Sequence, residues 1–373
     1  MTKKKLLVIH PSLAPYRVDF FNSLYEYYDA KFFFFNTNLL NQAFDQDKLK
    51  NTIKFHCNYL IRGFNLPGRS FRFGIWKILN KEQPDMVICP EYNLINIVVI
   101  LNRFLFRRKF KIYSMCDDNI SVAKNASFFK NVSRKIQLRL LDGIILTHTE
   151  IVEWYRLRLK PPAKLLIFPI IRKENIFRNQ LESSLPIAED YRDTYNLKGK
   201  KVILFVGRLT AVKNLELLLD AFSTVFKKHQ DAVLVIVGSG PMEDKINDKI
   251  MQYGLRSAVV LPGRFEGREL LAWYHLANLF ILPSTNELFG AVVNEALLAG
   301  CYVLVSNLAG GASLIKEGCN GETFNPNDLN EIAVILQNNL KKDELFGYQR
   351  VLRESRVLFP YKNAFNSLIQ ELN

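Results

Sequence analysis

The sequence lacks a hydrophobic run long enough to cross a membrane as a helix. Its most apolar stretch, residues 94–106, is interrupted by Asn96, Asn102 and Arg103 and falls short of the roughly 18 to 20 apolar residues that a span requires. The opening MTKKKLLVIH has basic residues ahead of an apolar run, but His10 and Pro11 end that run too early for a signal peptide. We therefore expect no membrane span and no leader, and we interpret the opening run as a buried strand.

The sequence also lacks paired cysteines, repeats and low-complexity segments. Its five cysteines contain no CxxC pair and are odd in number, and Cys89 and Cys301 lie within apolar runs. This pattern predicts reduced thiols in a cytoplasmic protein rather than a disulfide framework. With 373 residues, 49% of them hydrophobic, the chain is long enough for two globular domains of ordinary size.

Acidic residues are scarce in the first half of the chain. Residues 1–180 contain 30 Lys and Arg against 14 Asp and Glu, whereas residues 181–373 contain 20 against 22, so the net charge of +14 comes from the first half. Such asymmetry favours an anionic partner, and a merely solvated basic surface is the alternative. In LPGRSFRFG (66–74) and NRFLFRRKFK (102–111), aromatic residues alternate with Arg and Lys, as on surfaces that rest on anionic membranes. No base-reading motif supports a nucleic-acid partner.

Short apolar runs alternate with helical patterns in both halves. The runs of the first half are KLLVIH, KFFFF, DMVICP, KFKIYSM and DGIILTH, and those of the second are KVILFVG, AVLVIVG, AVVLPG, LFILPS and CYVLVS. Continuous apolar strands separated by helices predict parallel sheets covered on both faces. We therefore expect an α/β protein of two doubly wound Rossmann-like domains facing a cleft, with ligand sites at the strand ends.

The polar composition around residues 173–199 predicts a linker between these domains. The first domain is expected at residues 1–172 and the second at residues 200–359. A last helix at about residues 360–373 is expected to pack back on the first domain.

The first strand of the second domain ends in a cue for phosphate binding. Gly207 follows VILFV, and Arg208 and Lys213 come just before a helical pattern. A glycine allows close approach of the backbone to a ligand, and two cations near a helix start suit a diphosphate. Solvated cations at a turn are the alternative interpretation.

The stretch STNELFGAVVNEALLAG (284–300) places two glutamates around the start of an apolar helix. Glu287 lies in the loop before Phe289 and Gly290, and Glu295 lies in the second helical turn. Carboxylates on either side of free helix amides suit a ligand with hydroxyl groups at both ends and a diphosphate between them, as in a nucleotide sugar. Because Glu295 lies in a helix that is apolar almost all round, it requires a partner.

These motifs resemble the C-terminal domain of retaining glycosyltransferases of family four, which have the GT-B fold. The resemblance rests on GRLTAVKN, VGSGPMEDKI, the segment LPGRFEGRELLAWYHLANLFILPSTNELFGAVVNEALLAG, and the later Gly310-Gly311 and Asn320-Gly321. It extends over about residues 200–328.

The resemblance implies a role for each matching residue. Arg208 and Lys213 would bind the donor diphosphate, and Glu287 would hold hydroxyls of the donor sugar. Backbone amides of Phe289 and Gly290 would contact sugar or phosphate. Glu295 would bind the ribose.

The first domain departs from the family pattern. A proline-tyrosine-arginine step stands where a glycine-rich loop is usual, and IYSMCDDN lacks the histidine that many members carry near the donor sugar. Candidate acceptor contacts here are Tyr16, Arg17, Asp117 and His148. Packing roles for the first two, and a structural role for the histidine, are the alternatives.

No metal is expected. Asp45-Gln-Asp47 spells a DxD pattern, but no apolar strand precedes it. In the family that this chain resembles, an Arg–Lys pair supplies the positive charge that a metal supplies elsewhere.

The sequence therefore predicts a cytoplasmic, metal-independent, retaining glycosyltransferase, peripheral on the inner face of the membrane. It would move a hexose-type sugar from a nucleotide diphosphate sugar to a hydroxyl of a glycan or lipid-linked acceptor, in cell-surface polysaccharide or glycolipid synthesis. The donor base, UDP or GDP, is left open. A nucleotide-sugar epimerase of the same fold and a non-catalytic carbohydrate- or membrane-binding protein are the alternatives.

Overall fold

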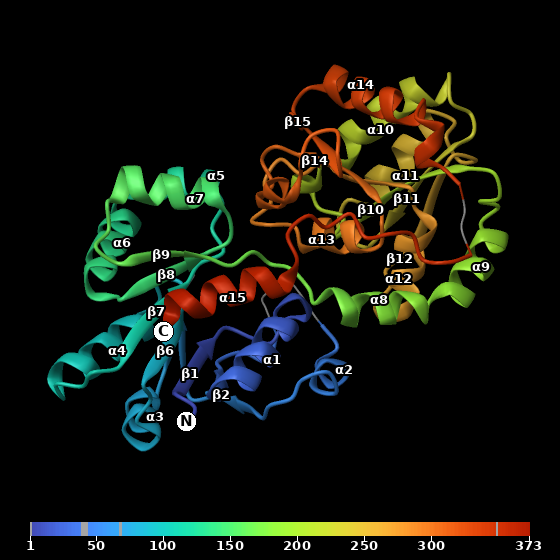
Figure 1. Ribbon diagram of the computed structural model, residues 1–373. Coiled ribbons are helices and arrows are strands. Elements are labelled where there is room, and N and C mark those ends of the chain that lie inside the picture. The colour runs from blue at the N-terminus through green and yellow to red at the C-terminus, as the bar shows by residue number, and fades with distance from the viewer. Residues whose placement is uncertain (1, 39–43, 67–68, 348–349) are drawn as a thin grey trace. The chain divides into compact units, whose positions relative to one another are not determined.

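The computed structural model describes residues 2–38, 44–66, 69–347 and 350–373, and it divides into two compact units (Figure 1). Unit 1 comprises Met1–Ile170 and Ala364–Asn373, and unit 2 comprises Ile171–Asn363. Each unit is built on its own parallel sheet with helices on both faces. The α/β class predicted from the alternation of strand and helix patterns is confirmed.

The sheet of unit 1 has the order β3-β2-β1-β6-β7-β8-β9 over the described residues, and all neighbouring strands are parallel. Its strands are β1 (Lys5–His10), β2 (Asp29–Phe34), β3 (Cys57–Tyr59), β6 (Met86–Pro90), β7 (Lys111–Met115), β8 (Gly143–Leu146) and β9 (Lys164–Ile167). The central strands are apolar on both sides because helices cover both faces. A separate hairpin pairs β4 (Gly63–Leu66) with β5 (Arg69–Arg72).

Right-handed crossovers distribute the helices of unit 1 over the two faces of its sheet. The chain moves from β1 to β2 in one direction and from β6 to β9 in the other. One face therefore carries α1 (Val18–Tyr27), and the other carries α3 (Ile75–Glu82), α4 (Leu94–Leu105), α6 (Phe128–Leu140) and α7 (Thr149–Trp154).

The last helix, α15 (Tyr361–Leu372), belongs to unit 1 from Ala364 onward. The ring of Phe365 lies 6.5 Å from the ring of Phe168. At the end of the helix, Lys111 Nζ donates to the carbonyl oxygen of Leu372 at 3.3 Å, and Lys164 Nζ donates to that of Glu371 at 3.0 Å. Two cations thus satisfy carbonyls of the last turn, where the helix dipole favours positive charge.

The sheet of unit 2 has the order β12-β11-β10-β13-β14-β15 within the described residues and is also parallel. Its strands are β10 (Lys201–Val206), β11 (Ala232–Val237), β12 (Val259–Gly263), β13 (Leu279–Leu282), β14 (Tyr302–Ser306) and β15 (Gly321–Phe324). One face carries α10 (Leu215–Phe226), α11 (Glu243–Gln252) and α14 (Leu329–Leu340), and the other carries α12 (Gly267–Leu276) and α13 (Ala291–Leu298).

The segment interpreted as a linker at residues 173–199 is largely helical. It forms α8 (Glu174–Glu182) and α9 (Leu185–Thr194), which contact α12, and α8 also contacts α13. Phe177 and Leu181, one helical turn apart, are fully buried. The segment therefore belongs to unit 2, because these apolar side chains cover a face of its core that would otherwise be exposed.

No helix in the described ranges is long and apolar enough to cross a membrane.

Candidate functional site

The strand order of unit 2 reverses between β10 and β13, which lie side by side. In open parallel sheets, ligands bind at the carboxyl ends of the strands at such a switch point. Gly207 follows β10, and Ser284 comes two residues after β13. The backbone N–H of Thr285 donates to the carbonyl oxygen of Val212 at 2.9 Å, so the loops after the two strands are joined.

The joined loops bring together two of the predicted site residues. Lys213 Nζ donates to Glu287 Oε2 in an ion pair, and the Ser284 hydroxyl lies 3.4 Å from the same oxygen. The side chains of Lys213 and Glu287 are 15% and 18% exposed, so the pair is largely shielded yet reachable from solvent. An ammonium and a carboxylate that share one opening can bind a phosphate and a hydroxyl of the same ligand.

Two glycines allow the loop after β11 to pack on the loop after β10. A Cβ on Gly238 would lie 1.8 Å from the carbonyl oxygen of Gly207, and one on Gly240 would lie 2.5 Å from that of Leu209. These glycines therefore serve loop packing. The side chain of Arg208, in the loop that they support, is exposed.

The start of α13 requires a glycine. Gly290 is the N-cap residue, with a φ of 85° in the left-handed region. A Cβ there would lie 2.9 Å from Leu282 Cδ2 and 3.2 Å from Glu287 Cγ. Phe289 is buried, so its side chain serves the core and its backbone alone is available to a ligand. The glycine at position 290 thus leaves room for the Glu287 side chain in its observed conformation.

Glu295 has partners from two distant segments. The Tyr274 hydroxyl donates to Glu295 Oε2 at 3.0 Å, and Arg172 Nη1 lies 3.6 Å from Glu295 Oε1. Burial, and next the charge of Glu295, raise the pKa of Tyr274 well above its usual value, so this hydroxyl remains a donor. The Arg172 backbone N–H also donates to Asn294 Oδ1 at 2.9 Å. Sequence patterns indicated the need for a partner, and the structure identifies Tyr274 and Arg172.

In unit 1, the candidate acceptor residues Arg17 and Asp117 form an ion pair. The Arg17 side chain is 1% exposed and that of Asp117 is 30% exposed. The pKa of Tyr16 is raised to about 12, mainly by burial and secondly by the charge of Asp117. Asp117 is therefore more accessible than Arg17 to a ligand in solution.

The two histidines at strand ends of unit 1 are buried and neutral at pH 7. His148 is the N-cap residue of α7, and its Nε2 has no hydrogen-bond partner among the described residues. Burial lowers the pKa of His148 to about 4. His10 Nδ1 lies 2.9 Å from the carbonyl oxygen of Ser12, and burial, with the charge of Arg17, lowers its pKa to about 4 as well. A neutral His148 can accept a hydrogen bond but carries no charge for a phosphate.

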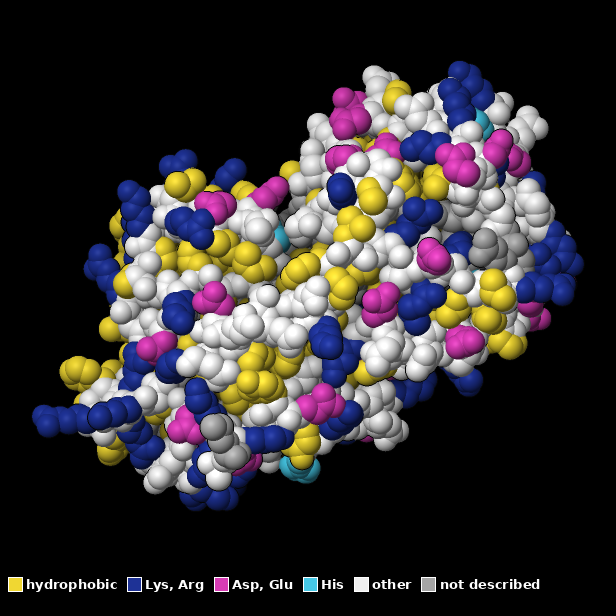
Figure 2. Space-filling model, viewed as in Figure 1, with side chains coloured by type: hydrophobic (Ala, Val, Ile, Leu, Met, Phe, Trp, Pro, Cys, Tyr) yellow, Lys and Arg dark blue, Asp and Glu magenta, His cyan; other side chains and the backbone are white. Residues whose placement is uncertain are grey.

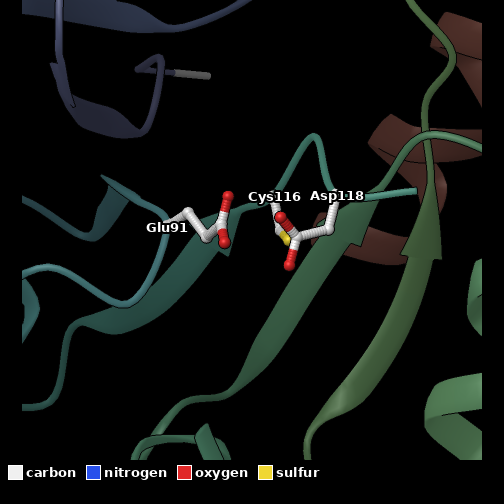
Figure 3. Close-up of side chains that lie close together, drawn as sticks. All are labelled: Glu91, Cys116 and Asp118. Atoms are coloured by element: carbon white, nitrogen blue, oxygen red, sulfur yellow. The ribbon is translucent and has the colours of Figure 1, made fainter. Parts of the chain in front are cut away.

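A further group at the same sheet edge was not predicted. Glu91, which follows β6, lies close to Cys116 and Asp118, which follow β7 (Figure 3). Arg134 forms an ion pair with Asp118, and Lys130 Nζ lies 3.7 Å from Glu91 Oε1 and 3.8 Å from Asp118 Oδ2. Arg134 thus neutralises Asp118 and Lys130 lies near both carboxyl groups, so basic side chains of the protein already occupy the surroundings that a metal ion would need. The position of Glu91 directly after a strand is the signal that could have identified it.

Protonation supports this interpretation of the cluster. Burial, and secondly the neighbouring Asp118, raise the pKa of Glu91 to about 8. Burial also raises the pKa of the Cys116 thiol well above its usual value. At neutral pH a protonated carboxyl and a neutral thiol are poor metal ligands.

The DxD pattern at Asp45 and Asp47 belongs to a helix cap. Asp45 precedes α2 (Gln46–Lys50), and its Oδ1 accepts hydrogen bonds from the backbone N–H groups of Lys48 at 3.0 Å and Asp47 at 3.2 Å. This is the usual role of an aspartate before a helix.

Comparisons with known proteins bear on the family and the fold of this chain. Residues 188–350 match the family model described as "Glycosyl transferases group 1". An uncharacterized glycosyltransferase of Methanocaldococcus jannaschii is 36% identical over 171 residues, which cover 42% of this chain and 44% of the relative. Spore coat protein SA of Bacillus subtilis is 29% identical over 48% of this chain and 51% of its own. The matches thus span about half the length of these relatives.

A similar solved structure is that of Anabaena HepE in complex with UDP, with a TM-score of 0.72 and 16% sequence identity over 99% of this chain and 97% of that one. At this identity the likeness shows the fold. The segment 188–350 is therefore similar to the glycosyl transferases group 1, and the chain carries the two Rossmann-like domains of the GT-B fold.

Proposed function

We propose that this protein is a metal-independent, retaining glycosyltransferase that moves a hexose-type sugar from a nucleotide diphosphate sugar to a hydroxyl of a glycan or lipid-linked acceptor. The observation that carries the proposal is the Lys213–Glu287 pair at the switch point of unit 2. It offers a cation and a carboxylate to one ligand beside the N-terminus of α13.

Each member of the Lys213–Glu287 pair contacts a different part of the donor. The Lys213 ammonium has three N–H donors, so it can bind a phosphate oxygen while it still donates to Glu287. Glu287 then accepts hydrogen bonds from hydroxyls of the donor sugar. Arg208, exposed in the adjoining loop, adds a second cation for the diphosphate. Glu295, held by Tyr274 and Arg172, has a fixed carboxylate for the two ribose hydroxyls.

The reaction breaks the bond between the anomeric carbon and the leaving phosphate oxygen. A bond from the acceptor oxygen to the same face of that carbon forms, and the acceptor proton passes to the departing phosphate. This course follows from the resemblance to retaining enzymes. Lys213 and Arg208 stabilise the charge that develops on the leaving diphosphate, a contribution usually worth about 10²- to 10³-fold in rate for one preorganised contact. The partly exposed Asp117 of unit 1 is the proposed contact for the acceptor hydroxyl.

The proposal is tested first by ligand-dependent melting of the purified protein. UDP is the first probe because HepE has been solved with UDP and with UDP-glucose, and GDP and ADP follow. A ligand that binds the folded state raises the melting temperature by mass action. We expect a rise with one nucleotide, abolished by Glu295→Gln and retained by Glu243→Gln, which changes an exposed glutamate of α11.

Product analysis with the nucleotide sugar of that base then separates the candidate activities. Transfer to an acceptor with retained anomeric configuration supports the proposal. Conversion of the sugar without an acceptor identifies an epimerase. Binding with neither transfer nor hydrolysis across an acceptor panel identifies a non-catalytic binder, and no melting shift with any nucleotide contradicts the donor site itself.

A further inference from the structure

Helix α4 of unit 1 presents an apolar stripe to solvent. Leu94–Leu105 buries one side against the sheet, as the buried Ile95, Val99 and Ile100 show. The opposite side carries large hydrophobic side chains at positions i, i+4, i+7 and i+8, namely Ile97, Leu101, Phe104 and Leu105. Phe104 is 78% exposed. A second stripe at helical spacing has no place in the core and indicates a surface for a partner.

Helix α6 has the same property. Its buried side includes Leu138 and Arg134. Its outer side carries Phe128, Phe129, Val132, Ile136 and Leu140 at a spacing of close to four residues, and all are exposed. The two phenylalanine side chains are 76% and 80% exposed. These two stripes together are called the α4–α6 face below.

The two helices that carry these stripes lie side by side. Near the helix ends, Arg103 of α4 pairs with Asp142 and donates to the carbonyl oxygen of Leu140 in α6. Near the helix starts, Lys130 of α6 lies 3.7 Å from Glu91, which stands just before α4. The helices therefore run in the same direction along one surface of unit 1. Figure 2 shows hydrophobic and basic side chains gathered together where α4 ends.

The charge around this face is of one sign. Neither α4 nor α6 contains an acidic residue. Residues 94–140 contain ten Lys and Arg and only two acids, Asp117 and Asp118, and each of these is paired with an arginine. Lys135 and Arg139 of α6 and Arg107, just after α4, are exposed. Cations with long alkyl stems can border an apolar stripe while their charges reach toward anionic groups.

We propose that the α4–α6 face docks on the surface of an anionic lipid bilayer. The apolar stripes would enter the boundary between headgroups and acyl chains, and the bordering Arg and Lys would contact lipid phosphates. Charge decides between this occupant and a second copy of the chain. Two copies would bring two uncompensated basic surfaces together, which repel each other.

Arg72, in the other basic segment noted in the sequence, adds no charge to this face. Arg72 in the second strand of the β4–β5 hairpin is buried, and its guanidinium donates to the carbonyl oxygens of Phe35 at 3.1 Å and Phe71 at 2.9 Å. Residues 67–68 of the same segment lie outside the described residues. The membrane contact is therefore assigned to α4 and α6.

The test is co-sedimentation of the full chain with vesicles. One set contains phosphatidylcholine alone, and the other contains equal parts of phosphatidylglycerol and phosphatidylcholine. We expect binding to the second set only, weakened by 0.5 M NaCl because salt screens the headgroup charges. Phe128→Ser with Phe129→Ser is expected to lower the partition coefficient at least about tenfold, since two apolar anchors are lost. Lys135→Gln with Arg139→Gln is expected to lower it by a similar factor, since two cations are lost.

Matched variants in unit 2 control for composition and folding. Leu358→Ser with Phe359→Ser removes two exposed apolar side chains, and Lys227→Gln with Lys228→Gln removes two exposed cations. Both are expected to bind as the wild type does. The Phe128 and Phe129 side chains are mostly exposed, so the melting temperature of their variant is expected to stay within about 2 °C of wild type.

Three outcomes overturn the proposal: no binding to anionic vesicles, equal binding to both vesicle sets, or equal loss in the unit 2 controls. Sedimentation of the protein in the absence of lipid would also overturn it, because the pelleting would then not report membrane binding. A dimer that Phe128→Ser with Phe129→Ser dissociates would assign the face to a second copy instead.

Discussion

The Lys213 ammonium contacts Glu287, and we propose that it also stabilises the charge of the donor diphosphate. Replacing Lys213 by methionine removes both interactions, and the size of the effect on turnover tests the second one. We expect Lys213→Met to fold, because the Ser284 hydroxyl still lies 3.4 Å from the carboxylate that loses its ion pair. Breaking an exposed pair costs about 0 to 1 kcal/mol and breaking a fully buried one about 3 to 5 kcal/mol. With side chains 15% and 18% exposed, the loss of stability should be about 1 to 3 kcal/mol.

The expected loss of turnover is larger than this stability change can explain. One preorganised charge on a developing anion contributes about 10²- to 10³-fold, which corresponds to roughly 3 to 4 kcal/mol of activation free energy. The measurement is single-turnover transfer with the donor identified by melting, at a temperature where the variant is fully folded. Lys227→Met, an exposed lysine just after α10, is the matched control and should react as wild type does.

A double-mutant cycle with Glu287→Gln provides the refutation. If Lys213 acts on the diphosphate, Lys213→Met should lower turnover by a large factor in the Glu287→Gln background as well. If Lys213 merely positions Glu287, the double variant should be no slower than Glu287→Gln alone. The second result would refute the role proposed for the lysine while leaving the donor site in place.

Three further predictions concern stability. Gly238→Ala should lower the free energy of unfolding by about 3 kcal/mol or more, because its Cβ would lie 1.8 Å from a carbonyl oxygen. The control is Gly254→Ala, where φ is +65° and the space around the glycine is open, and it should cost only about 1 to 2 kcal/mol. Urea titrations measure both variants. Because the folded-state pKa of Glu91 is raised to about 8, the stability from its bound proton is lost as pH rises from about 4.5 through 8. Glu91→Gln should therefore raise the melting temperature at pH 8 relative to wild type and do so much less at pH 5; equal effects at both would contradict the shift. Because the pKa of His10 is lowered to about 4 in the folded state, the unfolded protein binds one more proton between pH 6.5 and 4. The free energy of unfolding therefore falls by up to about 3 kcal/mol as pH drops through this range. His10→Gln should flatten this part of the curve of stability against pH, whereas His56→Gln, at an exposed histidine, should not.

Sequence patterns predict the central strands of both sheets and miss most of the edges. Three of the four edge strands, β3 (CNY), β9 (KLLI) and β15 (GETF), lie outside the predicted runs. An edge strand has a neighbour on one side only and is covered less completely, so it needs no continuous apolar run. Helices α8 and α9 were missed for a related reason, since their buried residues are few and polar residues surround them.

Some residues of the candidate site could likewise be predicted from nearby sequence, whereas others depend on the fold. Lys213 and Glu287 each stand near the carboxyl end of a predictable strand, so the rule for parallel sheets predicts them without knowledge of the fold. The partners of Glu295 could not be predicted in this way. Tyr274 lies on α12 and Arg172 lies at the start of unit 2, and only the packing of α13 brings them to the carboxylate.

The division of unit 1 between the two ends of the chain sets an order for biosynthesis. The ribosome completes residues 171–363, all of unit 2, before it adds the ten residues that finish unit 1. Until Phe365 arrives, Phe168 lacks this partner, and Lys111 and Lys164 await the helix end that they bind. Unit 2 can therefore reach its native state first although it is encoded second, and unit 1 closes through contacts between segments about 200 residues apart in the sequence.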